Sequence, residues 1–267
     1  MTALTFRLEL RRSVALTAWL GLIVVAYGAI MGLFYPIMVD NAAQIEDYMK
    51  LFPKEMMAAF GMTGSLADPG VFFSTYIGSL LWPVIAAIAA ILTATRATAA
   101  DVERGWLEMP LGTPLTRRQY LLASIGGQVV VMAVLALVTV VGVLAAAALV
   151  NVTFDAARFL AAGAVLFLFG AAIAGVCSLV AVVTLSRGIA AGVTSAILIA
   201  MYLANVIAQL SPDLAWVGNL SAFKHLMLAD MIDTGAVDWV AVVIFTVVAL
   251  GGWLLALALF RRRDLLA

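Results

Sequence analysis

The chain has 267 residues, of which 65% are hydrophobic and 11% are charged, and its 15 basic and 15 acidic residues give no net charge. A soluble domain of this length needs far more polar surface, and a neutral chain lacks the basic surface that binds nucleic acid. A single cysteine and a single histidine exclude a disulfide framework and a cysteine- or histidine-rich metal site. The composition therefore indicates an integral membrane protein.

Six stretches are long and apolar enough to cross a bilayer as helices, for which about 20 apolar residues are needed. We predict spans at Val14–Val39, Val71–Thr95, Tyr120–Val150, Ala156–Thr184, Ile189–Gln209 and Val237–Phe260. The first apolar core is about twice as long as that of a secretory signal, so it is read as a retained helix. We predict an all-α integral membrane protein whose residues 1–267 form a single six-span domain.

The distribution of basic residues predicts the orientation of these spans. With the N-terminus inside, eleven lysines and arginines lie in cytosolic segments and four lie outside. The inside residues are Arg7, Arg11, Arg12, Arg96, Arg104, Arg117, Arg118, Arg187, Arg261, Arg262 and Arg263. The outside residues are Lys50, Lys54, Arg158 and Lys224. Because positive residues concentrate in cytosolic loops, we predict that both termini are cytosolic.

Two outer segments are longer than tight turns, one after the first span (Asp40–Gly70) and one after the fifth (Ser211–Asp238). Apolar residues recur at helical spacing in the first of them, at Ile45, Tyr48, Met49 and Phe52. This spacing predicts a helix that lies in the membrane interface with its apolar face down. The second segment contains Trp216 and a Lys224-His225 pair, and we expect short helices there that cap the outer side.

The central parts of the spans contain no charged residue and no histidine. This argues against a proton- or sodium-coupled carrier and against an intramembrane hydrolase, because both need such groups. Uncharged polar residues instead recur on the second span and on the fifth span. On the second span they are Thr75, Ser79 and Trp82, and Pro83 is expected to kink this helix. On the fifth span they are Ser195, Tyr202, Asn205 and Gln209. Two interpretations stay open: these residues line a substrate path, or they pack and hydrogen-bond the helices together.

Two further patterns concern the first and third spans. A GxxxG match at Gly28–Gly32 predicts a close helix contact.

The polar segment Asp101–Tyr120 follows the second span and combines exposed apolar residues with two prolines. Its part Thr116-Arg-Arg-Gln119 matches a capping box that opens the third span. We predict a helix that ends at Gly105 and a short rigid elbow after it, rather than a solvated turn.

The same segment resembles the loop after span two in the permease subunits of type-2 ABC exporters. That loop runs as Glu-x-Gly-x-x-x-x-x-Leu-x-x-Pro-x-x-Arg-x-x-Tyr, and this chain supplies Glu103, Gly105, Leu111, Pro114, Arg117 and Tyr120 in order. Met109-Pro110 stands where the family more often has leucines. The stretch Leu220–His225, with Ala222 in place of the usual proline, and the ending Phe260–Leu265 are also similar to that family.

The resemblance implies that this loop, including Trp106 and Leu107, is the coupling helix that seats in a groove of an ATPase subunit. It also implies an amphipathic elbow helix at Thr2–Ser13, although Phe6, Leu8 and Leu10 alternate with charged residues at a spacing closer to that of a strand.

None of the three lysines lies in a Gly-x-x-x-x-Gly-Lys-Ser/Thr loop, so the chain is not expected to be an enzyme. ATP and Mg²⁺ are expected in a separate ATPase polypeptide. We expect two permease chains, identical or paralogous, with two ATPase subunits in a prokaryotic plasma membrane, exporting an amphipathic drug, antibiotic peptide or lipid. The alternatives are a membrane scaffold or signalling partner that holds a cytosolic protein, and an ATP-independent channel or carrier.

Overall fold

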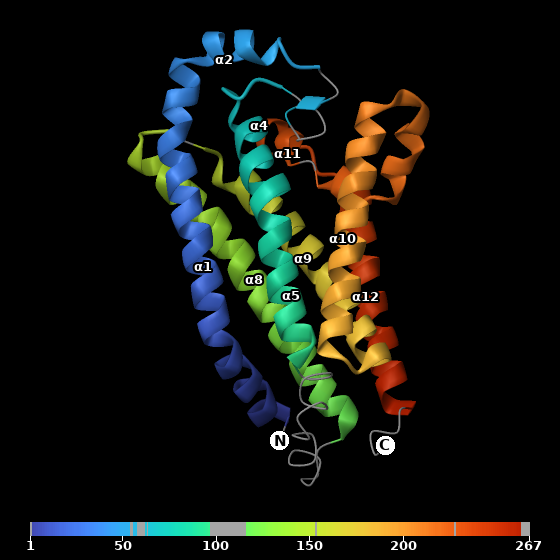
Figure 1. Cartoon of the computed structure of the whole chain (residues 1–267). Helices are drawn as coiled ribbons and strands as arrows, with labels where there is room; N and C mark the ends of the chain where they lie inside the picture. Colours follow the sequence, from blue (N-terminus) through green and yellow to red (C-terminus); the bar gives the residue numbers. More distant parts are fainter. Residues whose placement is uncertain are drawn as a thin grey trace.

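The computed structural model describes residues 2–53, 56–57, 62, 64–96, 116–152, 154–226 and 228–262, and in this part the regular structure is helical, without strands. Six segments are long and apolar enough to cross a membrane, and they form an elongated bundle (Figure 1). They are α1 (Thr2–Asp40), the consecutive helices α4 (Pro69–Phe73), η1 (Ser74–Leu81) and α5 (Trp82–Ala94), then α8 (Arg117–Leu149), α9 (Ala156–Thr184), α10 (Arg187–Leu210) and α12 (Trp239–Arg262). The six predicted spans are confirmed.

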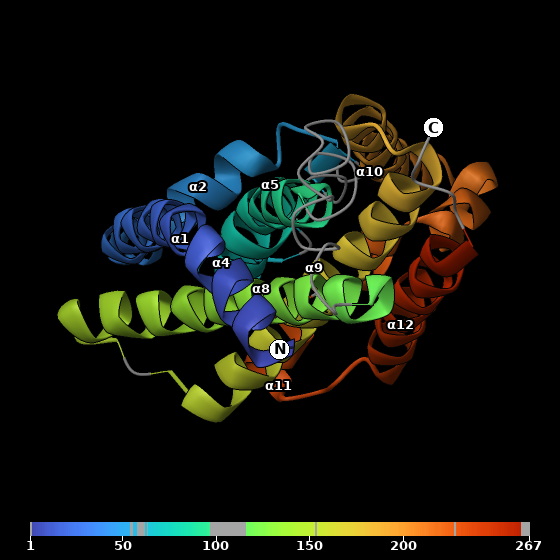
Figure 2. The same ribbon diagram turned by 90° about the horizontal axis from the view of Figure 1, so that it is seen from below.

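Helix α9 lies at the centre of the bundle. It packs against α5, α8, α10 and α12, and the view along the bundle shows these helices around it (Figure 2). In its most apolar stretch, 72% of the residues are buried. A helix that is apolar on all sides is expected to occupy such an interior position.

Helix α1 lies on the outside of the bundle and packs along α8. The GxxxG match is part of this contact: a Cβ atom added at Gly32 would lie 2.4 Å from the Cβ of Ala146, and one at Gly28 would lie 4.0 Å from the backbone of Gly142. The predicted close helix contact at Gly28–Gly32 is confirmed, and it joins two helices of the same chain.

The second span contains a stretch of π-helix, η1, directly before α5. The backbone N–H of Trp82 donates to the carbonyl oxygen of Ile77, five residues earlier. The next residue, Pro83, has no N–H, and in an α-helix its ring would clash with the carbonyl four residues before it. The wider turns of η1 therefore accommodate the proline, and the disturbance expected at Pro83 takes the form of a π-helix.

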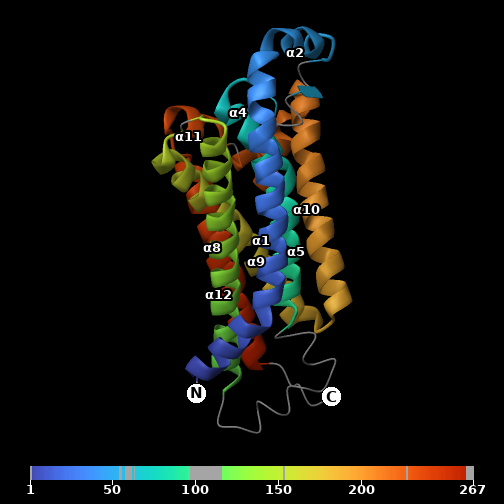
Figure 3. The ribbon, with the colours of Figure 1, turned by 90° about the vertical axis from the view of Figure 1, so that its left-hand side faces the viewer.

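The first residues of α1 continue the helix of the first span. The alternation in Thr2–Ser13 wrongly suggested the spacing of a strand. The buried side chains described in this segment recur every four residues, at Thr5, Glu9 and Ser13, as expected for a helix. This face packs against α8, where a Cβ added at Gly127 would lie 3.6 Å from the Cβ of Glu9. Figure 3 shows this end of α1 bending away from the direction of the rest of the helix.

Short helices follow the first and fifth spans: α2 (Ala42–Met49), then η3 (Pro212–Leu220), η4 (Ala222–His225) and α11 (Ala229–Thr234). They lie at one end of the bundle, away from the end where α1 begins and α12 finishes (Figure 1). The assignment of this end to the outer side rests on the charge distribution and stays a prediction. The interfacial position of α2 also stays a prediction, and its Tyr48 side chain is 69% exposed.

Candidate translocation path and coupling segment

The polar residues singled out on the second span are mostly buried between helices. Thr75, Trp82 and Pro83 are buried and Ser79 is half-buried. The indole N–H of Trp82 donates to the carbonyl oxygen of Leu166 on α9 over 2.9 Å. Because η1 interrupts the regular α-helix, the 3.6-residue spacing that placed Thr75 and Trp82 on one face does not hold across it.

The polar residues of the fifth span lie on a helix with little burial. Ser195, Tyr202, Asn205 and Gln209 are all half-buried, and only 11% of the most apolar stretch of α10 is buried. The ring of Tyr202 meets the edge of Phe223 with centroids 5.5 Å apart. Helix α10 packs against α5 as well as α9, so the two helices that carry the polar residues touch. The substrate path along them stays a prediction.

A buried polar cluster on α8, α9 and α12 was missed by the sequence analysis. Gln128 is 1% exposed, and its Oε1 accepts hydrogen bonds from the hydroxyl of Ser178 and the indole N–H of Trp253, both over 3.0 Å. Its Nε2 lies 3.4 Å from the hydroxyl of Ser124, one turn earlier on α8. A lone amide in the third span was the available signal, because an amide in hydrocarbon needs partners from other helices.

A second missed contact fixes the start of the second span. Asp233 on α11 accepts a hydrogen bond from the backbone N–H of Gly70 over 2.8 Å, and the guanidinium of Arg158 donates to its carbonyl oxygen. Burial raises the pKa of the Asp233 carboxyl above its ordinary value, and the Gly70 N–H opposes that shift. A Cβ at Gly70 would lie 2.3 Å from the Asp233 carboxylate, so any larger residue would displace this side chain from its hydrogen bond. Residues so far apart in the sequence give no local signal for this contact.

Of the predicted coupling segment, Asp101–Tyr120, the structure describes only the last residues, from Thr116 onward. Glu103, Gly105, Trp106, Leu107, Leu111 and Pro114 lie outside the described residues, as do the predicted helix end and elbow. Arg117 opens α8, and Tyr120 is buried in its first turn. The capping box is confirmed: the Gln119 N–H donates to the Thr116 hydroxyl over 3.3 Å, and the Thr116 N–H donates to Gln119 Oε1 over 3.1 Å.

The residue described last before this segment contacts the beginning of α1. The guanidinium of Arg96, two residues after α5, donates to the hydroxyl of Ser13 over 3.3 Å. One turn earlier, the buried carboxylate of Glu9 pairs with Arg12 over 3.3 Å. The residues described on either side of residues 97–115 are therefore joined to two different spans, α1 through Arg96 and α8 through Thr116.

A family model with the description "ABC-2 family transporter protein" matches residues 7–265, a range that includes all six spans apart from the first residues of α1. A comparison with curated proteins finds no match.

Proposed function

The chain belongs to the ABC-2 family of transporter proteins and is the multi-pass membrane permease of an ABC transporter, and from this premise we propose that it forms half of the path of an ATP-driven exporter. The family match over residues 7–265 is the observation that carries the proposal. Permeases of this family work with an ATPase subunit. The membrane-spanning part described above is therefore one component of a larger machine.

The partner ATPase would bind ATP and Mg²⁺, because this sequence offers no P-loop for the phosphates. Two copies of that ATPase would serve two permease chains, which together provide twelve spans. The low burial of α10 supports this arrangement, since its exposed apolar side chains can pack against a second permease or against lipid.

Coupling would run through the segment that contains Glu103, Gly105, Leu111, Pro114 and Arg117. Movement of this segment would reach α8 through the capping box at Thr116, and α1 through the hydrogen bond between Arg96 and Ser13. Coupling of this kind requires two arrangements of the spans that the ATPase stabilises to different extents. The least buried span, α10, is the best candidate for the helix that moves.

The uncharged interior of the spans supports an amphipathic substrate, such as a drug, an antibiotic peptide or a lipid. Half-buried Tyr202, Asn205 and Gln209 would offer hydrogen bonds along the path while its walls stay apolar. A strongly charged substrate would meet no compensating charge there and would have a high cost of entry.

The first test is purification of the tagged chain from its native membrane in mild detergent, with mass spectrometry of the proteins that remain bound. We expect a P-loop ATPase in near-stoichiometric amount. The variants Glu103→Ala and Arg117→Ala should bind it at least about tenfold more weakly, because each removes a charge from the proposed contact with the ATPase, and tenfold corresponds to about 1.4 kcal/mol.

The matched control is Arg118→Ala, because Arg118 is exposed and stands next to the motif arginine without belonging to it. The Arg118→Ala variant should bind the ATPase as strongly as the unmodified chain does. A pure complex that contains no ATPase would overturn the exporter proposal in favour of a scaffold or channel. In proteoliposomes with the ATPase and ATP, unchanged transport by a well-inserted Glu103→Ala chain would overturn the coupling role.

A further inference from the structure

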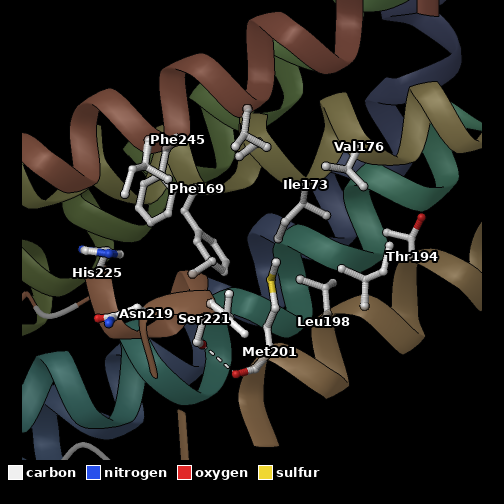
Figure 4. Close-up of a pocket in the computed structure, with 16 residues that line it drawn as sticks. Phe169, Ile173, Val176, Thr194, Leu198, Met201, Asn219, Ser221, His225 and Phe245 are labelled. Atoms are coloured by element: carbon white, nitrogen blue, oxygen red, sulfur yellow. Dashed lines mark hydrogen bonds between the residues drawn. The ribbon is translucent and has the colours of Figure 1, made fainter. Parts of the chain in front are cut away.

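A pocket of about 140 Å³ lies between α9, α10 and α12 (Figure 4). It exists because α10 and α12 both flank α9 and leave a space between them. Each of the three helices contributes large apolar side chains to its walls. They include Phe169 and Ile173 of α9, Leu198 and Met201 of α10, and Phe245 and Val248 of α12.

One end of the pocket is polar, and Figure 4 shows Asn219, Ser221 and His225 gathered there. The hydroxyl of Ser221 donates to the carbonyl oxygen of Met201 over 2.6 Å, which holds this end against α10. The ring of His225 faces the carboxylate of Asp238 over 3.5 Å. The polar end belongs to η3 and η4, at the end of the bundle, and the apolar part lies among the spans.

A positive charge stands beside this polar end. The ammonium of Lys224 donates to Asn219 Oδ1 over 2.5 Å. An ammonium group has three N–H donors, so this bond leaves two for another acceptor. The carboxylate of Asp238 is already turned toward His225 of this polar end. Lys224 therefore offers charge complementarity to an anion held at the polar end.

We propose that the pocket binds one acyl chain of an anionic phospholipid, with the lipid phosphate close to Lys224. An apolar cavity of about 150 Å³ holds a ligand of benzene size, so this pocket has room for a segment of about six carbon atoms. Its mouth opens at the surface of the bundle, because the lining residues Val248 and Leu220 are 38% and 66% exposed, and the side of a membrane-spanning bundle is covered by lipid. The proposal depends on the membrane location of the chain and not on the proposed export function.

The test uses the full chain in nanodiscs with a phosphatidylglycerol whose acyl chain carries a photoreactive diazirine. A phosphatidylcholine with the same acyl chain is the comparison. After irradiation, mass spectrometry of peptides shows which residues are labelled. Saturable labelling of the pocket segments at residues 169–176, 194–201 and 244–248, stronger with phosphatidylglycerol, is expected. Labelling spread evenly over exposed side chains of all six spans would overturn the proposal.

Variants of the pocket and of Lys224 separate binding of the acyl chain from binding of the headgroup. Val248→Trp should block the mouth and abolish the pocket labelling with both lipids, whereas the neighbouring Val247→Trp should not, because Val247 is 64% exposed and does not line the pocket. Ala172→Phe fills the pocket from α9 and gives a second blocking variant if Val248→Trp inserts poorly.

Lys224→Gln should lower phosphatidylglycerol labelling by about fivefold, which corresponds to about 1 kcal/mol, and lower phosphatidylcholine labelling less, because the choline ammonium offsets the phosphate charge. Equal labelling by the two lipids in the unmodified chain would overturn the anionic headgroup. Equal labelling in Val248→Trp and Val247→Trp would overturn the pocket itself.

Discussion

Helices α9 and α10 are neighbours in the same bundle and are held in very different ways. In the most apolar stretch of each helix, 72% of the residues are buried in α9 and 11% in α10. Interhelical hydrogen bonds join α9 to α5 through Trp82 and to α8 through Ser178. The hydrogen bond of Ser221 to Met201 and the ring contact of Tyr202 with Phe223 attach α10 to the short η4 helix. The bundle therefore combines a fixed core with a loosely held span.

The difference follows from how helices associate in a bilayer. Lipid tails are as apolar as leucine side chains, so burial of an apolar face gains little, and close packing and hydrogen bonds hold the helices together. Around α9 both are present: Gly175 and Gly252 bring α9 and α12 into backbone contact, and Gln128 bonds to Ser178 and Trp253. Helix α10 exposes Ile199, Leu203 and Ile207 at little cost in lipid.

The largest effect is expected at the contact between α9 and α12. A Cβ atom at Gly252 would lie 2.5 Å from the backbone carbon of Gly175, so Gly252→Ala must push the two helices apart. Overpacking of this kind costs about 1–3 kcal/mol, and we expect a clear fall in the melting temperature of the purified chain. In Gly251→Ala the new methyl group meets nothing within 4 Å, and stability should be unchanged or slightly higher. Equal stability of the two variants would contradict a tight core.

A smaller effect is expected from the buried amide. Gln128→Leu removes the acceptor of both Ser178 and Trp253 and should lower stability by about 1–2 kcal/mol, given that interhelical hydrogen bonds in membranes contribute about 0.6 kcal/mol each and at most about 1.7. Gln209→Leu makes the same change on α10, where the side chain is half-buried, and should stay within about 0.5 kcal/mol.

Thermal unfolding in detergent compares the two glutamine variants directly. Adding Ser178→Ala to Gln128→Leu should cost less than the sum of the single changes, because both remove the same hydrogen bond. Strict additivity of the two changes would show that the cluster does not tie α8 to α9.

Features set by local composition could be predicted from the sequence. Hydropathy located all six spans, because each is a continuous apolar run, and the capping box at Thr116 and the GxxxG motif at Gly28–Gly32 depend on residues a few positions apart. The segment Thr2–Ser13 shows the limit of that method, since its alternating pattern suggested strand spacing while the chain continued the helix of the first span.

Features that depend on partners distant in the sequence could not be predicted in this way. The hydrogen bonds of Gln128 join three helices, and the contact of Asp233 with Gly70 joins residues 163 positions apart. The π-helix before Pro83 changes the register of the second span, so a helical-wheel argument could not place Thr75 relative to Trp82. The sequence could therefore propose residues for the candidate site but not their arrangement, and the site itself stays a prediction.

The smallest expected effect tests the loosely held side of the comparison. Ser221 is 2% exposed, and its hydroxyl donates to Met201 and accepts from the Phe223 N–H. Ser221→Ala should release this end of α10 from η4 at a local cost of about 1 kcal/mol, so amide hydrogens at residues 201–210 should exchange about fivefold faster. The control is Ser211→Ala at the end of α10, because the Ser211 hydroxyl makes no capping hydrogen bond.

Hydrogen exchange measured by mass spectrometry on the full chain in nanodiscs resolves α9 from α10. If amide exchange becomes faster in both α9 and α10 of Ser221→Ala, the two helices open as one unit. The division into a fixed core and a loosely held span is then wrong. If amide exchange becomes faster only in α10, the low burial of this helix corresponds to a low local stability. A span that opens independently of α9 can change its position while the α8–α9–α12 core keeps its packing, which is the property that a moving element of a transport cycle needs.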